Sequence, residues 1–149
     1  MIENKLVKKL KELNYTISFA ESCTGGMLAS TIINVSGSSS VIKESYITYS
    51  EAAKMKILNV KKDTLNKYTV YSKEVALEMV KGLKNISNSD VCVSVTGIAE
   101  SDNSLCSCDF AIMINGEIFV EKYETTGSRN DVRQSYTKHI LTKILEKLA

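Results

Sequence analysis

The stretch of residues 16–26, TISFAESCTGG, constrains the fold more than any other part of the chain. An apolar run stops at small polar residues and two glycines, and a new apolar periodicity follows. This pattern predicts a strand, a tight turn and a helix start. The free N–H groups at such a helix start stabilise negative charge. Ser22 is expected there, and either it or Thr24 caps the helix, or Ser22 reacts beside those N–H groups.

Further periodicities predict alternating helices and strands, and Asn115–Gly116 favours a hairpin with a type I′ turn. Ile33 and Ile86 are expected on buried helix faces. The fold class is therefore α/β, with three α/β/α layers and a mixed sheet that includes one antiparallel hairpin. A length of 149 residues suits a single domain, 1–149. The expected order is helix 2–13, strand 15–19, helix 27–33, strand 45–49, helix 51–58, a turn-rich patch ending near 68, a helix after the N-cap Ser72, strand 91–95, hairpin 110–123 and helix 131–148.

Composition narrows the classes of partner. The formal net charge is only +2 and the lysines are spread along the chain, so no nucleic-acid partner is expected. No apolar run reaches the roughly 18 to 20 residues of a membrane span, and the first residues lack a signal-peptide pattern. We therefore expect a cytoplasmic protein without a membrane partner. The four cysteines, including a presumed loop pair at 106 and 108, fit neither a disulfide framework nor a zinc site.

The choice of catalytic base is narrow, because His139 is the only histidine and its place in the last helix favours a packed or surface role. A serine–histidine–acid triad is then excluded, and lysine is the natural substitute. Burial lowers the pKa of a lysine and lets it act as a base. Lys54, five residues beyond Tyr49 at the end of a predicted strand, fits this role best.

Six blocks of small and polar residues follow one another along the chain: 20–26 (AESCTGG), 37–39 (GSS), 48–50 (TYS) with Lys54, 72–76 (SKEVA), 96–99 (TGIA), and 127–129 (GSR) with Val132 and Arg133. In this order the blocks resemble the CinA carboxy-terminal domain family. The resemblance covers nearly the whole chain, and the first block is highly specific.

Members of that family include nicotinamide-nucleotide amidohydrolases, which convert nicotinamide mononucleotide and water to nicotinate mononucleotide and ammonia without a metal. The resemblance implies the same reaction here, with a small nucleotide as substrate and no cofactor. It implies Ser22 as the nucleophile, with Tyr49 and Lys54 as the network that moves its proton. We also expect a homo-oligomer.

Several further residues are expected to bind the substrate. The backbone N–H groups of Cys23, Thr24 and Gly25 are candidates for the oxyanion hole, and Gly26, Thr96 and Gly97 belong to matching blocks. Arg129 or Arg133 either holds the phosphate or lies at a solvated helix start. Glu21 either orients the turn, contacts ribose hydroxyls or has a capping or surface role. Cys23 competes with Ser22 as the nucleophile, because a thiol at a helix start can have a lowered pKa.

One segment departs from the family pattern. Typical members have a loop rich in glycine and proline where this chain has residues 100–108, beginning at Glu100. Glu51, Thr69 and Ser128 also stand where Asn, Gly and Asp are usual. These changes leave two alternatives to the deamidase open: a non-catalytic domain that binds a nucleotide or protein, and an amidohydrolase acting on another small amide.

Overall fold

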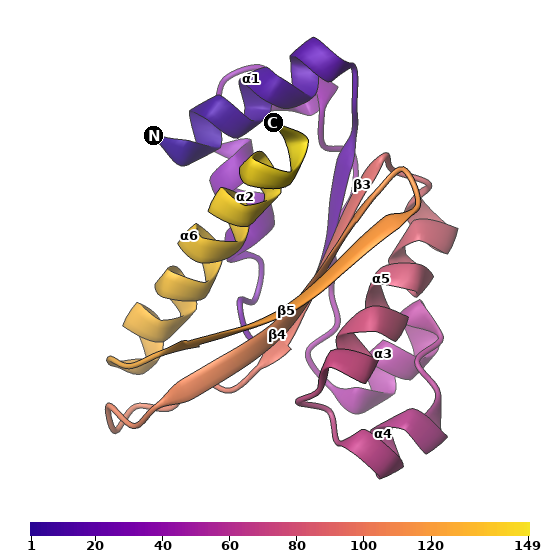
Figure 1. Ribbon diagram of the computed structural model, residues 1–149, viewed down its shortest axis with the longest axis vertical. Helices are drawn as coiled ribbons and strands as arrows, with labels where there is room; N and C mark the ends of the chain where they lie inside the picture. Colours follow the sequence, from indigo (N-terminus) through magenta and orange to yellow (C-terminus); the bar gives the residue numbers. More distant parts are fainter.

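The computed structural model describes residues 1–149, which form a five-stranded sheet with helices on both faces (Figure 1). The elements are α1 (Ile2–Leu13), β1 (Ile17–Glu21), α2 (Met27–Ile33), the 3₁₀ helix η1 (Ser38–Ser40), β2 (Tyr46–Ile47), α3 (Glu51–Leu58), α4 (Lys62–Tyr68), α5 (Lys73–Ser87), β3 (Val91–Gly97), β4 (Cys106–Ile114), β5 (Glu117–Thr125) and α6 (Arg129–Leu148). The strand order is β2-β1-β3-β4-β5. The first three strands pair in parallel, whereas β4 and β5 pair antiparallel, which confirms the predicted fold class.

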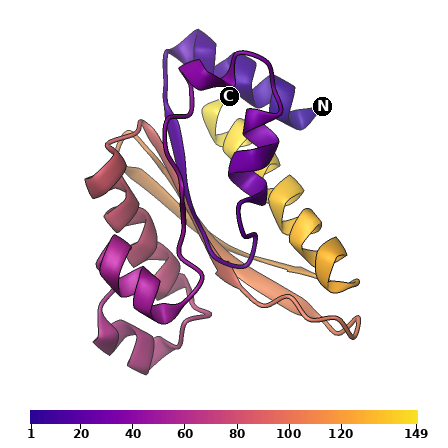
Figure 2. The same cartoon turned by 180° about the vertical axis from the view of Figure 1, so that it is seen from behind.

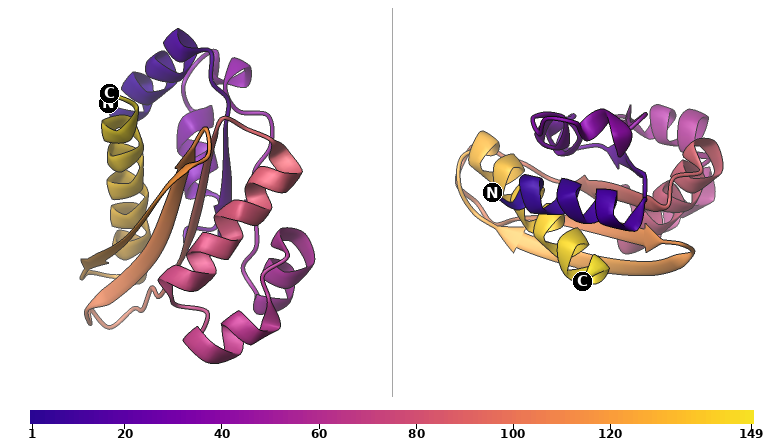
Figure 3. Two further views of the ribbon diagram at one scale, coloured as in Figure 1. Left: turned by 45° about the vertical axis from the view of Figure 1, so that its right-hand side comes forward. Right: turned by 90° about the horizontal axis from the view of Figure 1, so that it is seen from above.

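The helices divide into two layers. Helices α1, α2 and α6 cover one face of the sheet and α3, α4 and α5 cover the other (Figures 1 and 2). The left view in Figure 3 shows the sheet with α6 on one side and α5 on the other. Along β3 the side chains alternate, so Val93 packs in the core under α1, α2 and α6 while Cys92 packs under α5. The predicted burial of this strand on both faces is confirmed.

Asparagine sets several chain reversals. The hairpin turn has φ of 48° at Asn115 and 92° at Gly116, and the two positive values confirm the predicted type I′ turn. Asn14, Asn59 and Asn88 adopt the left-handed conformation directly after α1, α3 and α5. Asparagine tolerates this conformation better than most residues, so it ends these helices in the place where glycine is commoner.

Some local expectations were wrong. The supposed turn-rich patch before residue 68 contains helix α4, in which only Leu65 is buried, so the sequence has no apolar period there. Strand β2 is shorter than predicted, at two residues. Ile33 is 60% exposed and Ile86 is 43% exposed, because the buried stripes of α2 and α5 run along other residues of these helices.

The two neighbouring cysteines were also misplaced. Cys106 and Cys108 belong to β4 and are buried in the core under α6, two residues apart on one face of the strand. The hairpin therefore begins earlier than predicted. The connection between β3 and β4 is confined to residues 98–105, and this segment borders the site described next.

Candidate functional site

A serine and a lysine meet where β1 and β2 end. Ser22 directly follows β1, and Lys54 lies in α3, just after β2. Because β1 and β2 are parallel neighbours, their carboxyl ends lie at one edge of the sheet. Lys54 Nζ is 2.8 Å from Ser22 Oγ. Lys54 is fully buried and Ser22 is 6% exposed.

The surroundings of Lys54 suit a proton acceptor. Its Nζ also donates to the carbonyl oxygens of Thr48, at 2.8 Å, and Tyr49, at 3.2 Å. Burial lowers the pKa of Lys54 to about 8, while the negative charge of Glu51 opposes this shift. In the neutral amine the two N–H bonds satisfy the two carbonyl groups, and the lone pair is left for the Ser22 proton.

Tyr49 contributes two separate groups. Its carbonyl oxygen accepts from Lys54 and, at 3.4 Å, from Ser22 Oγ. The side chain is 62% exposed, and its hydroxyl accepts from Arg129 Nη2 at 3.2 Å. The phenol has no hydrogen bond to Ser22 or Lys54, so the main chain of Tyr49 contacts the pair directly.

The helix start that follows Ser22 binds an anion that the chain itself provides. The Glu21 carboxylate accepts from Thr24 Oγ1 at 2.6 Å and from the N–H groups of Gly26, Leu28 and Ala29 at 3.1, 2.9 and 3.0 Å. Glu21 is 1% exposed. Of the roles expected for Glu21, the structure favours two: its carboxylate orients the turn, and it caps the start of α2.

Ser22 does not cap α2, and neither does Thr24, contrary to one expectation. Helix α2 begins only at Met27, after Gly25 and Gly26 have turned the chain through left-handed conformations with φ of 56° and 101°. The two glycines therefore separate Ser22 from the first residue of α2. The helix dipole is matched by Glu21, and Ser22 is free to pair with the lysine.

The same turn presents backbone donors near Ser22. The N–H of Gly25 donates to the Ser22 carbonyl at 3.0 Å and is used within the turn, whereas the N–H groups of Cys23 and Thr24 have no acceptor in the chain. Arg133 holds the turn from α6, since its guanidinium donates to the carbonyl oxygens of Cys23, at 2.8 Å, and Thr24, at 3.1 Å. Arg133 therefore contacts the turn and does not line the cleft.

The Ser22–Lys54 pair opens into a cleft of about 360 Å³. Six residues predicted for the site line it: Ser22, Cys23, Tyr49, Lys54, Gly97 and Arg129. Six others do not line it: Glu21, Thr24, Gly25, Gly26, Thr96 and Arg133. Thr96 shows why, because its hydroxyl donates to the Val70 carbonyl at 2.9 Å and its side chain is buried.

One wall of the cleft is the segment after β3. At Gly97 an added Cβ would lie 2.6 Å from the Cβ of Cys108, so only glycine fits against β4. Helix α6 then fixes the next residues, because Tyr136 donates its hydroxyl proton to the Ile98 carbonyl at 2.6 Å and Arg129 donates to the Ala99 carbonyl. Arg129 is thereby held at the cleft.

Seven residues that line the cleft were not predicted as site residues: Ser50, Glu51, Val70, Tyr71, Ile98, Ala99 and Glu100. Of these, Ser50, Ile98 and Ala99 were named only as members of matching blocks, and Glu51 and Glu100 only as departures from the family pattern. Ser50 and Glu51 had a usable signal, since they lie between the two predicted residues Tyr49 and Lys54. Ser50 caps α3 through the N–H of Ala53 at 3.0 Å. The sequence around Tyr71 gave no such signal, because a single tyrosine before a helix cap is not part of any recognisable catalytic or binding motif.

Two other reactive side chains are poorly suited to the chemistry. Burial raises the pKa of Cys23 to about 12, which argues against the predicted alternative of a thiolate nucleophile. His139 stacks on Tyr123 with ring centroids 3.8 Å apart, and burial lowers its pKa. It is packed away from the cleft, as expected.

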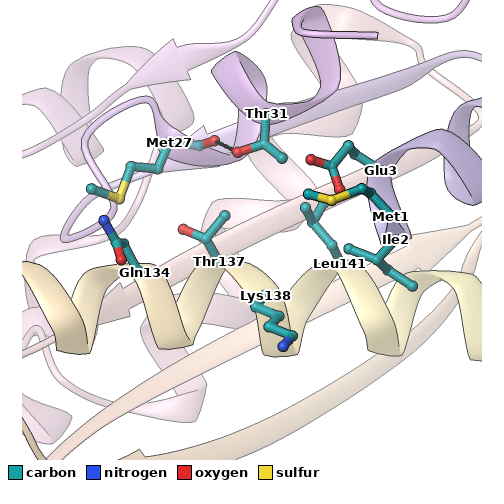
Figure 4. A pocket seen from close by; sticks show the side chains of 9 residues that line it. All are labelled: Met1, Ile2, Glu3, Met27, Thr31, Gln134, Thr137, Lys138 and Leu141. Carbon is teal, nitrogen blue, oxygen red and sulfur yellow. Dashed lines mark hydrogen bonds between the residues drawn. The ribbon is translucent and has the colours of Figure 1, made fainter.

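A larger cavity, of about 680 Å³, lies between the start of α1, helix α2 and helix α6 (Figure 4). Met1, Met27 and Leu141 give it an apolar lining, and Thr31 donates to the Met27 carbonyl beside it. It holds no paired nucleophile and base, so the smaller cleft is the candidate site.

Two other features are absent from the chain. The chain has no cluster of three or more metal-ligating side chains. No helix combines the length and the apolar character that a membrane span requires.

Comparison with known proteins identifies relatives of this fold. The family model of the CinA C-terminal domain matches residues 1–148. The CinA-like protein of Petrotoga mobilis is 39% identical over 150 residues, which cover 97% of this chain and 37% of that protein. The chain thus spans about a third of the length of the curated relatives it matches.

Solved structures of similar fold carry related names. A competence or damage-inducible protein from Enterobacter asburiae has a TM-score of 0.94 at 26% identity, covering 99% of this chain and 96% of that one. The competence/damage inducible protein CihA from Agrobacterium tumefaciens has a TM-score of 0.86 at 29% identity, covering 99% and 94%. Together with the match over residues 1–148, these likenesses lead to one conclusion: the chain belongs to the CinA C-terminal domain family.

Proposed function

We propose that the chain hydrolyses the carboxamide of nicotinamide mononucleotide to give nicotinate mononucleotide and ammonia, a reaction of pyridine nucleotide salvage. The observation that carries this proposal is the 2.8 Å contact between Ser22 Oγ and the fully buried Lys54 Nζ. A serine paired with a lysine of lowered pKa is suited to acyl transfer. The resemblance to the nicotinamide-nucleotide amidohydrolases of this family supports the choice of substrate.

In the first half-reaction Ser22 Oγ attacks the carboxamide carbon while its proton moves to Lys54 Nζ. The oxyanion that forms is held by the N–H groups of Cys23 and Thr24, the two free donors of the turn. The carbon–nitrogen bond then breaks, and Lys54 returns the proton to the leaving nitrogen. Ammonia departs, and a nicotinoyl ester on Ser22 remains.

In the second half-reaction water attacks the ester carbon and gives a proton to Lys54. The bond from carbon to Ser22 Oγ breaks, and Lys54 reprotonates the serine. The product leaves as a carboxylate after losing its proton to solvent. Arg129 binds the phosphate of the nucleotide, because its guanidinium lies at the cleft and matches phosphate oxygens in charge and geometry. Arg133, tied to two carbonyl groups of the turn, is the weaker candidate.

The test is release of ammonia from nicotinamide mononucleotide by the purified chain. Ser22→Ala is expected to lower kcat by about a thousandfold or more. Ser36→Ala, which changes an exposed serine away from the cleft, is the matched control and should leave the rate unchanged. Turnover that survives Ser22→Ala would remove this serine from the mechanism.

The same assay addresses the two alternatives. A binding domain without activity would bind the mononucleotide and release no ammonia. An amidohydrolase of other specificity would turn over another small carboxamide faster than the mononucleotide. A panel of carboxamides with and without a phosphate therefore separates the three functions.

A further inference from the structure

The rim of the cleft, defined by Glu51, Tyr71 and Glu100, takes no part in the proposed mechanism. All three side chains line the cleft and are exposed, with Tyr71 at 51%. Exposed tyrosine rings at a cleft supply apolar, flat surface for a ligand. The neighbouring Tyr49 adds a second such ring, 62% exposed. The rim therefore offers aromatic surface and negative charge together.

The charges of the cleft are unevenly placed. Of its four charged side chains, Lys54 is buried and Arg129 is engaged by the Ala99 carbonyl and the Tyr49 hydroxyl. The two that are exposed and have no hydrogen-bonded partner in the chain are the acids Glu51 and Glu100. An aromatic face carries partial negative charge, so tyrosine and carboxylate both favour a cation.

We propose that the rim selects a positively charged planar ring, with Tyr71 as its stacking surface and the carboxylates of Glu51 and Glu100 as its counter-charge. This inference rests on the proposed function and deepens it, since the nicotinamide ring of the mononucleotide is a pyridinium cation. Arg129 takes the anionic end of the same molecule. Neutral carboxamides of the same size are discriminated against at the rim.

The experiment compares two probes that differ mainly in charge: 1-methylnicotinamide, a cation, and nicotinamide, which is neutral. Binding is measured by ligand-observed NMR titration at low salt in the Ser22→Ala protein, so that turnover plays no part. The cation is expected to bind about three- to tenfold more tightly, and added salt should reduce the preference.

Variants of the rim locate the source of this preference. Glu51→Gln combined with Glu100→Gln keeps the size of both side chains and should bring the two affinities close to equal. Tyr71→Ala should weaken binding of both probes and of the cation more strongly. Glu12→Gln and Tyr68→Ala, which lie outside the cleft, are the matched controls and should change neither affinity.

Each outcome bears on the inference. Equal affinity for the two probes, no binding of either, or a preference that survives the double glutamine variant would overturn it. Ammonia release that depends on Ser22 but shows no preference for a cation would sustain the proposed function and reject the inference. A clear cation preference in a chain that releases no ammonia from the mononucleotide would sustain the inference and reject the proposed function.

Discussion

The floor of the cleft, Ser22 and Lys54, differs sharply from the rim formed by Glu51, Tyr71 and Glu100. The floor is buried and its polar atoms are hydrogen-bonded, whereas the rim is exposed and its polar atoms are mostly free. Contacts within the chain therefore fix the side chains of the floor, whereas the side chains of the rim have no hydrogen-bonded partner in the chain. Changes in the floor should act on kcat, and changes in the rim should act on KM.

The largest effect is expected from Lys54→Met, which removes the base and keeps a side chain of similar length. The value of kcat/KM should fall about a thousandfold, because Ser22 loses its proton acceptor. Lys56→Met changes an exposed lysine on the same helix and should have no effect on the rate. An active Lys54→Met protein would show that the floor is not the reactive part of the cleft.

A second prediction addresses the support beneath the floor. Glu21→Ala leaves three backbone N–H groups and the Thr24 hydroxyl without their acceptor. The free energy of unfolding should fall by about 3 kcal/mol. Denaturant unfolding measures this change, and Glu12→Ala, on an exposed face of α1, should stay within about 0.5 kcal/mol of the parent. A loss no larger than the control's would mean that the glycines alone shape the turn.

The pH profile tests the protonation of the floor. Burial lowers the pKa of Lys54 to about 8, and only its neutral form accepts a proton from Ser22. The ammonium forms as the pH falls, so kcat/KM should decrease about fiftyfold between pH 8 and pH 6. Initial rates of ammonia release across this range give the profile. A flat profile down to pH 5 would exclude Lys54 as the base.

The smallest effect is expected from Tyr49→Phe, because Tyr49 spans both regions. Its carbonyl accepts from Lys54 of the floor and is kept, while its exposed hydroxyl, which accepts from Arg129 beside the rim, is lost. KM should rise about two- to fivefold with little change in kcat, since one exposed hydrogen bond contributes about 1 kcal/mol or less. Steady-state kinetics separates the two constants. A hundredfold loss of kcat would give the phenol a direct part in the chemistry, and the division into floor and rim would fail.

Local rules predicted the parts of the fold in which neighbouring residues decide the structure. The Asn115–Gly116 turn and the Ser72 cap are set within four residues, and both formed as expected. Helix α4 was missed because it buries only Leu65 and has no apolar repeat. The prediction for Cys23 failed for a similar reason. Its place near a helix start suggested a lowered thiol pKa, but burial, which depends on the whole fold, raises this pKa.

The site was predictable only in part. Ser22 and Lys54 were predicted because each follows a predicted strand, because no suitable histidine is available, and because their blocks resemble the CinA family. The structure adds the reason why they meet, since β1 and β2 are parallel neighbours. The bonds of Glu21 depend on two left-handed glycines, and the sequence alone does not indicate that its carboxylate reaches α2. Tyr71 and Glu100 come from segments far apart in the chain, and only tertiary structure brings them to one cleft.

Helix α6 contacts both sides of the cleft, and this has a consequence for how a substrate is used. Arg133 holds the turn that bears Ser22, while Arg129 and Tyr136 hold the segment of Ile98 and Ala99. A phosphate that binds Arg129 thus acts on the same rigid body that positions the nucleophile. Under the proposed function, binding energy from the phosphate would then be available at the reacting atoms. A substrate lacking the phosphate would then react more slowly once bound, as well as bind more weakly.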